Sequence, residues 1–140
     1  MIQELYAASM AGVEIQLIVR GMCCLRPGIA GVSDKIEVRS IIGRFLEHTR
    51  VLYFENDGNP EFYCSSADWM ERNLYSRVET LFPIEDSKLR ERIMSELELY
   101  LTDNTQAWIL QSDGNYVRET PGDNPPVSAQ QSLLTEITGA

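Results

Sequence analysis

The stretch IQELYAASMAGVEIQLIV, residues 2–19, decides how this chain folds. Apolar residues recur at helical spacing over residues 2–10, and Gly12 can end the helix that this spacing predicts. Residues 13–19 alternate at first and then become wholly apolar, which is typical of a strand that enters a core. A helix followed by a strand is the second half of a βαβ unit. We therefore expect an α/β fold, and because no strand precedes the helix we interpret the chain as a fragment.

The rest of the sequence continues in the same way. Short apolar runs and turn signals predict further strands at 36–42, 51–54, 61–65, 78–84, 107–110 and 115–118. A capped helix is expected from Asp86 to about Leu101. The expected architecture is a mixed central β-sheet with flanking helices, formed by residues 1–118 without a first strand. Residues 119–140 are expected to be a linker and tail, partly flexible, with one or two helical turns at 128–134.

The composition limits the classes of function. The net charge is −9, and residues 55–140 carry 16 acidic against 6 basic side chains, so nucleic-acid binding is not expected. The three cysteines and single histidine form no zinc pattern, so we expect reduced thiols and no metal site. The sequence shows neither a signal peptide nor an apolar run of about 20 residues. A cytoplasmic protein is therefore expected.

The single histidine, His48, lies in the run SIIGRFLEHTR at residues 40–50. His48 and Arg50 are two residues apart beside a predicted strand, so we expect their side chains on the same face. An imidazole can move a proton while a guanidinium holds an anion, and phosphate chemistry needs both. The alternative interpretation is a structural histidine beside an arginine that forms a surface ion pair.

The pattern His48-x-Arg50-x4-Glu55 resembles the His-x-Lys-x4-Asp motif of the phospholipase D superfamily. Longer runs resemble the C-terminal catalytic domain of the bacterial polyphosphate kinase family. These runs are IVRGMCCLRPG at 18–28, SIIGRFLEHTR at 40–50, SADWMERNL at 66–74, RVE at 77–79 and LFPI at 81–84. The resemblance covers about residues 2–118, and it implies a phospholipase D-like mixed sheet with flanking helices.

The resemblance also implies roles for individual residues. The family transfers the γ-phosphoryl group of ATP reversibly to inorganic polyphosphate, through a phosphohistidine in a preceding domain. His48 matches the family's second active-site histidine, which is implied to contact the nucleotide phosphates and to act as a general acid. Arg20 matches an ATP-binding arginine, and Arg50 takes the phosphate-cradling position of the superfamily motif. Arg72 and Arg77 are expected to line the path of the polyphosphate.

The resemblance further implies cofactors and partners. Magnesium is expected to arrive with ATP, with its ligands outside this chain. The expected partners are ATP, ADP, polyphosphate, the remaining domains of the enzyme and further copies in a homo-oligomer. The family can also attach to the periphery of the inner membrane.

Two alternatives to the kinase interpretation stay open. One is a phospholipase D-type phosphodiesterase that acts as a dimer, and the other is a non-catalytic polyanion-binding module. Because the phosphohistidine would lie outside the chain, we expect these 140 residues to be inactive alone.

Overall fold

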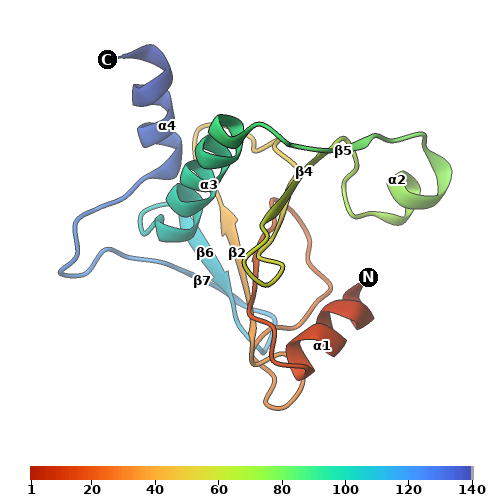
Figure 1. The fold of residues 1–140 in the computed structure, drawn as a ribbon. Coiled ribbons are helices and arrows are strands. Elements are labelled where there is room, and N and C mark those ends of the chain that lie inside the picture. The colour runs from red at the N-terminus through yellow and green to blue at the C-terminus, as the bar shows by residue number, and fades with distance from the viewer. Residues whose placement is uncertain (140) are drawn as a thin grey trace. The chain divides into compact units, whose positions relative to one another are not determined.

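The computed structural model describes residues 1–139, which form two compact units (Figure 1). Unit 1 comprises Met1–Glu47 and Glu96–Ala140, and unit 2 comprises His48–Ser95. The elements are α1 (Ile2–Met10), β1 (Ile15–Ile18), β2 (Ile36–Ile41), β3 (Val51–Phe54), β4 (Glu61–Ser65), α2 (Glu71–Ser76), β5 (Leu81–Pro83), α3 (Ser87–Thr102), β6 (Ala107–Leu110), β7 (Tyr116–Arg118) and α4 (Ala129–Thr138).

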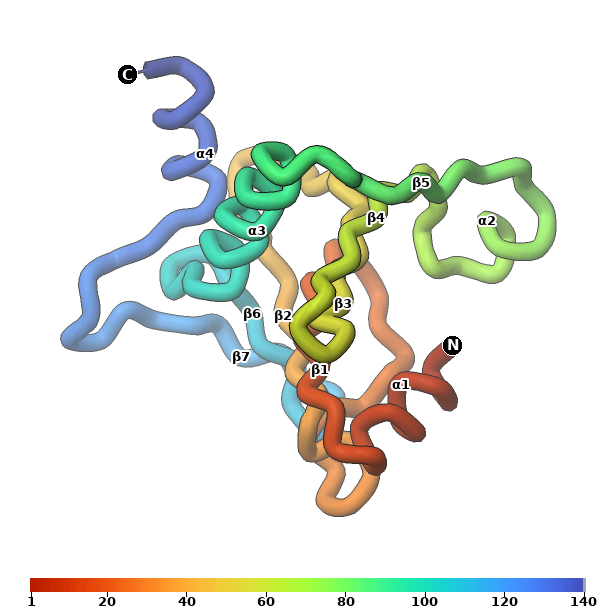
Figure 2. The backbone as a smooth tube through the Cα atoms, viewed as in Figure 1, coloured from red at the N-terminus to blue at the C-terminus, as the bar shows by residue number. Residues whose placement is uncertain are grey.

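Unit 1 is built on a four-stranded mixed sheet with the strand order β1-β2-β6-β7. β1 runs parallel to β2, with Ile15 opposite Ile36, whereas the pairs β2–β6 and β6–β7 are antiparallel. A parallel pair cannot be joined by a tight turn, so residues 19–35 form a long connection between β1 and β2. Figure 2 traces this connection through the first part of the chain.

The apolar core of unit 1 is centred on Val38 in β2, which is fully buried. Leu25, Ile36 and Leu110 complete the buried cluster, and side chains of α1 pack against it. Leu5 and Tyr6 of the predicted apolar stripe therefore pack against the core, whereas Ile2 and Met10 are exposed. Gly12 follows the last turn of α1 with φ at +96°, a conformation that glycine adopts without strain.

Asp103 and Asn104 fix the segment between β7 and α4 to unit 1. Asp103 is 1% exposed, and its Oδ1 accepts hydrogen bonds from the N–H groups of residues 105–107. Its Oδ2 accepts one from the N–H of Ala129 at 2.7 Å, where α4 begins. Asn104 exchanges two hydrogen bonds with the main chain of Val127. The 10-residue helix α4 is thus anchored at its start and is longer than the sequence predicts.

Unit 2 is built on an antiparallel sheet with the strand order β3-β4-β5. β3 and β4 form the predicted hairpin, and the carboxylate of Glu55 accepts a hydrogen bond from the N–H of Gly58 in its turn, at 2.8 Å. Phe62 of β4 is buried, and the ring of Tyr53 lies 4.9 Å from its ring centre. In the described part of unit 2, Ala67 is the other buried apolar residue. The apolar core of unit 2 is therefore small.

The mixed α/β class and most predicted elements are confirmed, with three differences. The strands divide over two sheets, and the expected mixed sheet is the one in unit 1. The short helix α2 was not predicted, because six residues are too few for a periodic apolar stripe. The strand predicted at 78–84 covers only Leu81–Pro83, since Val78 is fully exposed. None of the described helices is long and apolar enough to cross a membrane.

Candidate functional site

The candidate site centres on His48, which lies in an irregular segment before β3. The expectation that His48 and Arg50 share a face of a strand is wrong, because β3 begins only at Val51. Strand pairing is reached at Arg50, whose carbonyl accepts a hydrogen bond from the N–H of Ser65 at 2.9 Å. His48 is therefore an exposed residue of an irregular segment.

Arg50 links the main chain at His48 to Asp68. Its Nε donates to Oδ1 of Asp68 at 2.9 Å, and its Nη1 donates to the carbonyl oxygen of His48 at 2.8 Å. The side chains of the Arg50–Asp68 pair are 27% and 24% exposed, so solvent screens this pair only in part. A guanidinium can make both bonds because its donors are held in a planar fork. Arg50 thus holds the backbone of the histidine as well as carrying a positive charge.

A second polar cluster closes the loop that carries Asp68. Glu79 accepts hydrogen bonds from the hydroxyl of Ser66 and, at 2.7 Å, from Nδ2 of Asn73. Asn73 lies on α2 and is 4% exposed, and its Oδ1 has no partner among the described residues. The bond from Ser66, followed by the bond from Asn73, lowers the pKa of Glu79 from its ordinary value. Glu79 is therefore a carboxylate at neutral pH that ties α2 to the loop.

The two arginines predicted to line the polyphosphate path lie at the two ends of α2. Arg72 is the second residue of α2 and Arg77 follows its last residue, and both are exposed. Arg77 also contributes to the lowered pKa of Glu79. Unit 2 therefore contains four of the five predicted site residues, which are His48, Arg50, Arg72 and Arg77.

Arg20, the fifth predicted site residue, belongs to unit 1 and lies two residues beyond β1. Its Nη1 donates to the carbonyl oxygen of Glu47, the residue before His48. The carboxylate of Glu47 accepts a hydrogen bond from the hydroxyl of Tyr100 at 2.8 Å. Burial, and then this hydrogen bond, raises the pKa of Tyr100, so its hydroxyl stays a donor at neutral pH. The structure thus places Arg20 at the peptide group that leads into His48.

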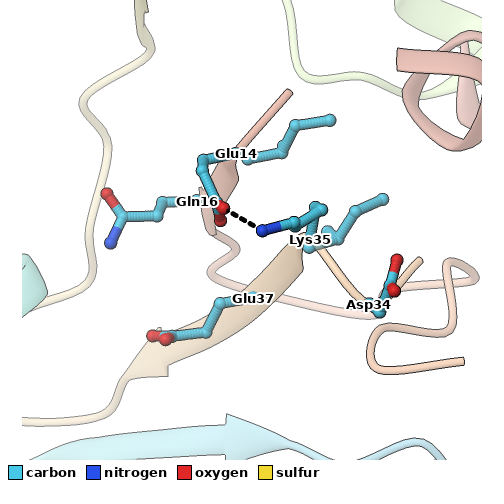
Figure 3. A pocket seen from close by; sticks show the side chains of 7 residues that line it. Glu14, Gln16, Asp34, Lys35 and Glu37 are labelled. Carbon is cyan, nitrogen blue, oxygen red and sulfur yellow. Dashed lines mark hydrogen bonds and ion pairs between the residues drawn. The ribbon is translucent and has the colours of Figure 1, made fainter. Parts of the chain in front are cut away.

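A pocket in unit 1 offers a different surface, lined by residues 14–16 and 34–37 (Figure 3). Lys35 Nζ is paired with the carboxylate of Glu14, and this hydrogen bond raises the pKa of Lys35. Asp34 and Glu37 also line the pocket, so its charge is unfavourable for phosphate. The pocket contains none of the predicted site residues, and the candidate site remains at His48.

The described residues do not form a magnesium site. No group of three His, Cys, Asp or Glu side chains among residues 1–139 is arranged to hold a metal ion.

The site thus consists of an exposed histidine whose carbonyl is bound by the arginine of an arginine–carboxylate pair. Comparison with known protein families shows to which family the chain belongs. The family model described as polyphosphate kinase C-terminal domain 2 matches residues 1–130, and the chain belongs to this family.

The curated relatives are named polyphosphate kinase. The chain is 64% identical over 138 residues to the protein from Pseudomonas putida and 63% identical over 137 residues to that from Pseudomonas aeruginosa. These alignments cover 98% and 97% of this chain but only 19% and 20% of the relatives. The crystal structure of polyphosphate kinase from Porphyromonas gingivalis matches with a TM-score of 0.93 at 45% identity, over 99% of this chain and 21% of that one. The chain spans about a fifth of the length of these relatives.

Three residues around the site were missed by sequence reasoning, namely Glu47, Asn73 and Gln130. Glu47 and Gln130 are 83 positions apart and contact each other directly, so no local pattern connects them. Asn73 lies in the run 66–74, for which the resemblance implied no individual role, and the structure shows it buried and bound to Glu79. Only co-variation or a structure would have found these residues.

Proposed function

We propose that this chain forms part of a polyphosphate kinase, which transfers the γ-phosphoryl group of ATP reversibly to inorganic polyphosphate. The phosphohistidine intermediate would form on a residue outside the chain. The observation that carries the proposal is an exposed histidine, His48, whose carbonyl is held by Arg50 in a chain of the polyphosphate kinase family.

His48 acts as the general acid in this proposal. An imidazole can give a proton to the oxygen that departs with ADP. Arg20 and Arg50 neutralise phosphate charge, because phosphoryl transfer depends mainly on positioning and charge stabilisation. Arg50 carries its positive charge beside His48, because its Nε and Nη1 bind Asp68 and the carbonyl of His48.

Arg72 and Arg77 contact the polyphosphate in this proposal, because both are exposed and cationic. Magnesium neutralises the ATP phosphates when it is bound with the nucleotide. In this proposal the ligands of magnesium lie outside this chain. We further propose a cytoplasmic homo-oligomer that can attach to the periphery of the inner membrane.

The proposal is tested in a complete kinase. We would replace the matched 138 residues of the Pseudomonas putida polyphosphate kinase with this chain, which is 64% identical to them. His48→Ala in this chimera is expected to abolish both phosphohistidine formation from ATP and polyphosphate synthesis. Thr49→Ala, at the exposed neighbouring position, is the matched control and should leave both near the level of the parent chimera.

The alternatives predict other outcomes. If His48→Ala leaves both reactions near the parent rate, His48 is structural and the proposed role fails. Phosphodiester hydrolysis that depends on His48 would instead favour a phospholipase D-type enzyme. Polyphosphate binding that survives His48→Ala, in a chimera without kinase activity, would favour a binding module. The 140-residue chain alone should not turn over ATP, because the phosphohistidine is expected elsewhere.

A further inference from the structure

We propose that Gln130 of α4 is a positioning residue, which holds the main chain immediately before His48 and so sets the location of the imidazole. This inference rests on the proposed function, because it concerns how the same histidine is held for the reaction. It assigns a role to a residue near the end of the chain, in the segment that the sequence predicts to be a tail.

Gln130 makes three hydrogen bonds to the segment that leads into His48. Its Nε2 donates to the carbonyl oxygen of Phe45 and to Oε1 of Glu47, both at 2.7 Å. Its Oε1 accepts a hydrogen bond from the N–H of Phe45 at 3.0 Å. The amide thus pairs with both main-chain polar groups of Phe45, in the way that a neighbouring strand would. The irregular residues 43–47 gain from Gln130 the backbone partners that regular structure normally supplies.

Gln130 can serve as a fixed support because its own position is anchored. The residue is 6% exposed, and it follows Ala129, whose N–H is bound by the buried carboxylate of Asp103 at 2.7 Å. Asp103 also binds the N–H groups of residues 105–107, at the start of β6. The support for the loop before His48 therefore runs from the central sheet of unit 1, through Asp103, to Gln130.

Glu47 is held from more than one side. One carboxylate oxygen accepts from Gln130 and the other accepts from the hydroxyl of Tyr100. The carbonyl oxygen of Glu47 accepts from Arg20. The peptide group between Glu47 and His48 is consequently restrained in both position and direction, because hydrogen bonds weaken steeply when they are misaligned.

Gly43 shows how closely the loop approaches Gln130. A Cβ built on Gly43 would overlap with Oε1 of Gln130 and would lie 2.5 Å from Oε1 of Gln106. A side chain at position 43 would therefore require the ends of the Gln106 and Gln130 side chains to move.

The test uses the chimeric kinase described above. Gln130→Ala removes all three hydrogen bonds, and Gln130→Glu places a carboxylate against Glu47. Each is expected to lower kcat by roughly 10- to 100-fold, since an active-site displacement of about 1 Å can have that effect. The KM for ATP should change by less than about threefold, because the interaction acts on the histidine rather than on ground-state binding. Gln131→Ala, at the next and exposed position of α4, is the matched control with near-parent kcat.

A double variant distinguishes positioning from folding. Glu47→Gln combined with Gln130→Glu exchanges the amide and the carboxylate, so a hydrogen bond between them can form again. We expect this pair to recover about tenfold of the kcat lost in Gln130→Glu. All values are expressed per folded molecule, with the folded fraction taken from thermal melting.

The outcomes separate this inference from the proposed function. If His48→Ala abolishes activity while both Gln130 variants keep the parent kcat, the positioning role is overturned and the proposed function stands. If His48→Ala itself has no effect, the proposed function fails first. An equal loss of kcat in Gln131→Ala, or no recovery in the double variant, also overturns the positioning role.

Discussion

The two units of this protein are stabilised in different ways. Among the described residues, seven of the nine buried apolar side chains belong to unit 1 and only Phe62 and Ala67 belong to unit 2. Unit 2 contributes ten of the 21 exposed large apolar side chains, although it comprises only residues 48–95. Unit 1 therefore combines a larger apolar core with the buried carboxylate of Asp103, whereas unit 2 combines a small core with polar pairs such as Arg50–Asp68 and Asn73–Glu79.

The two units also contribute different parts of the proposed site. His48 and Arg50 belong to the unit with the small core, and the anchored loop before them belongs to the unit with the large one. Sites that bind ligands are commonly drawn from the less stable parts of a fold.

The largest effect is expected from the loss of Asp103, whose buried carboxylate binds the start of α4 in unit 1. Asp103→Ala leaves several buried N–H groups without an acceptor, so we expect the free energy of unfolding of unit 1 to fall by roughly 4 kcal/mol. Hydrogen exchange of the amides in β2 and β6 measures this loss. Asp123→Ala, at an exposed position of the segment after β7, is the control and should change protection by less than about 0.5 kcal/mol. Equal effects of both variants would contradict the anchoring role of Asp103.

A smaller loss, confined to unit 2, is expected from its core. Phe62→Ala should remove roughly 3 kcal/mol, because it empties the main buried apolar position of that unit. Hydrogen exchange should rise in β3–β5 and remain low in β2 and β6. Phe54→Ala, in the same hairpin but exposed, serves as the control. If protection falls equally in both units, they are not stabilised separately and the comparison breaks down.

The third prediction concerns Arg50 of unit 2 and its effect on catalysis. Arg50→Lys keeps the charge but not the fork, so one amine cannot serve both Asp68 and the His48 carbonyl in the same geometry. We expect kcat of the chimeric kinase to fall about tenfold. Arg118→Lys, which loses only a single exposed bond to the carbonyl of Thr105, should leave kcat near the parent value. Equal kcat in the two variants would argue against a role of Arg50 in holding His48.

The smallest expected effect is a pH dependence of unit 2. The folded pKa of Glu79 is lowered from its ordinary value of 4.5, chiefly by the hydrogen bond from Ser66. Its contribution to stability is therefore fully present above pH 4.5 and is lost as the pH falls through the lower, folded pKa. Denaturant midpoints followed by the fluorescence of Trp69, with Trp108 replaced by Phe, measure this change. Glu79→Gln should flatten the curve below pH 4.5, and an unchanged curve would contradict the assignment.

Much of the fold could be predicted because its signals are local. The helical spacing of residues 2–10, the cap at Asp86 and the Asp113-Gly114 turn act over a few residues. Asp86 does cap α3, since its Oδ1 accepts from the N–H groups of Lys88 and Leu89. The turn at Gly114 joins β6 to β7 as predicted, with φ at +93°.

The partition into two sheets could not be predicted from local signals. Strands β3–β5 pair only with one another, and strand partners depend on contacts between segments far apart in the sequence. Local signals were also insufficient to predict the residues that support the site. His48 and Arg50 were found through a motif, but Asp103 looks like an ordinary loop residue until its hydrogen-bond partners are known. The Asp103–Thr105 spacing, typical of an Asx turn, was its one local signal.

The close approach at Gly43 has a consequence for how such chains can diverge. A side chain at position 43 would meet the ends of the Gln106 and Gln130 side chains, so these two side chains would have to move. Among related sequences, we expect a larger residue at 43 to occur more often together with a different residue at 106 or 130. Three positions that are distant in the gene are therefore coupled by space rather than by sequence.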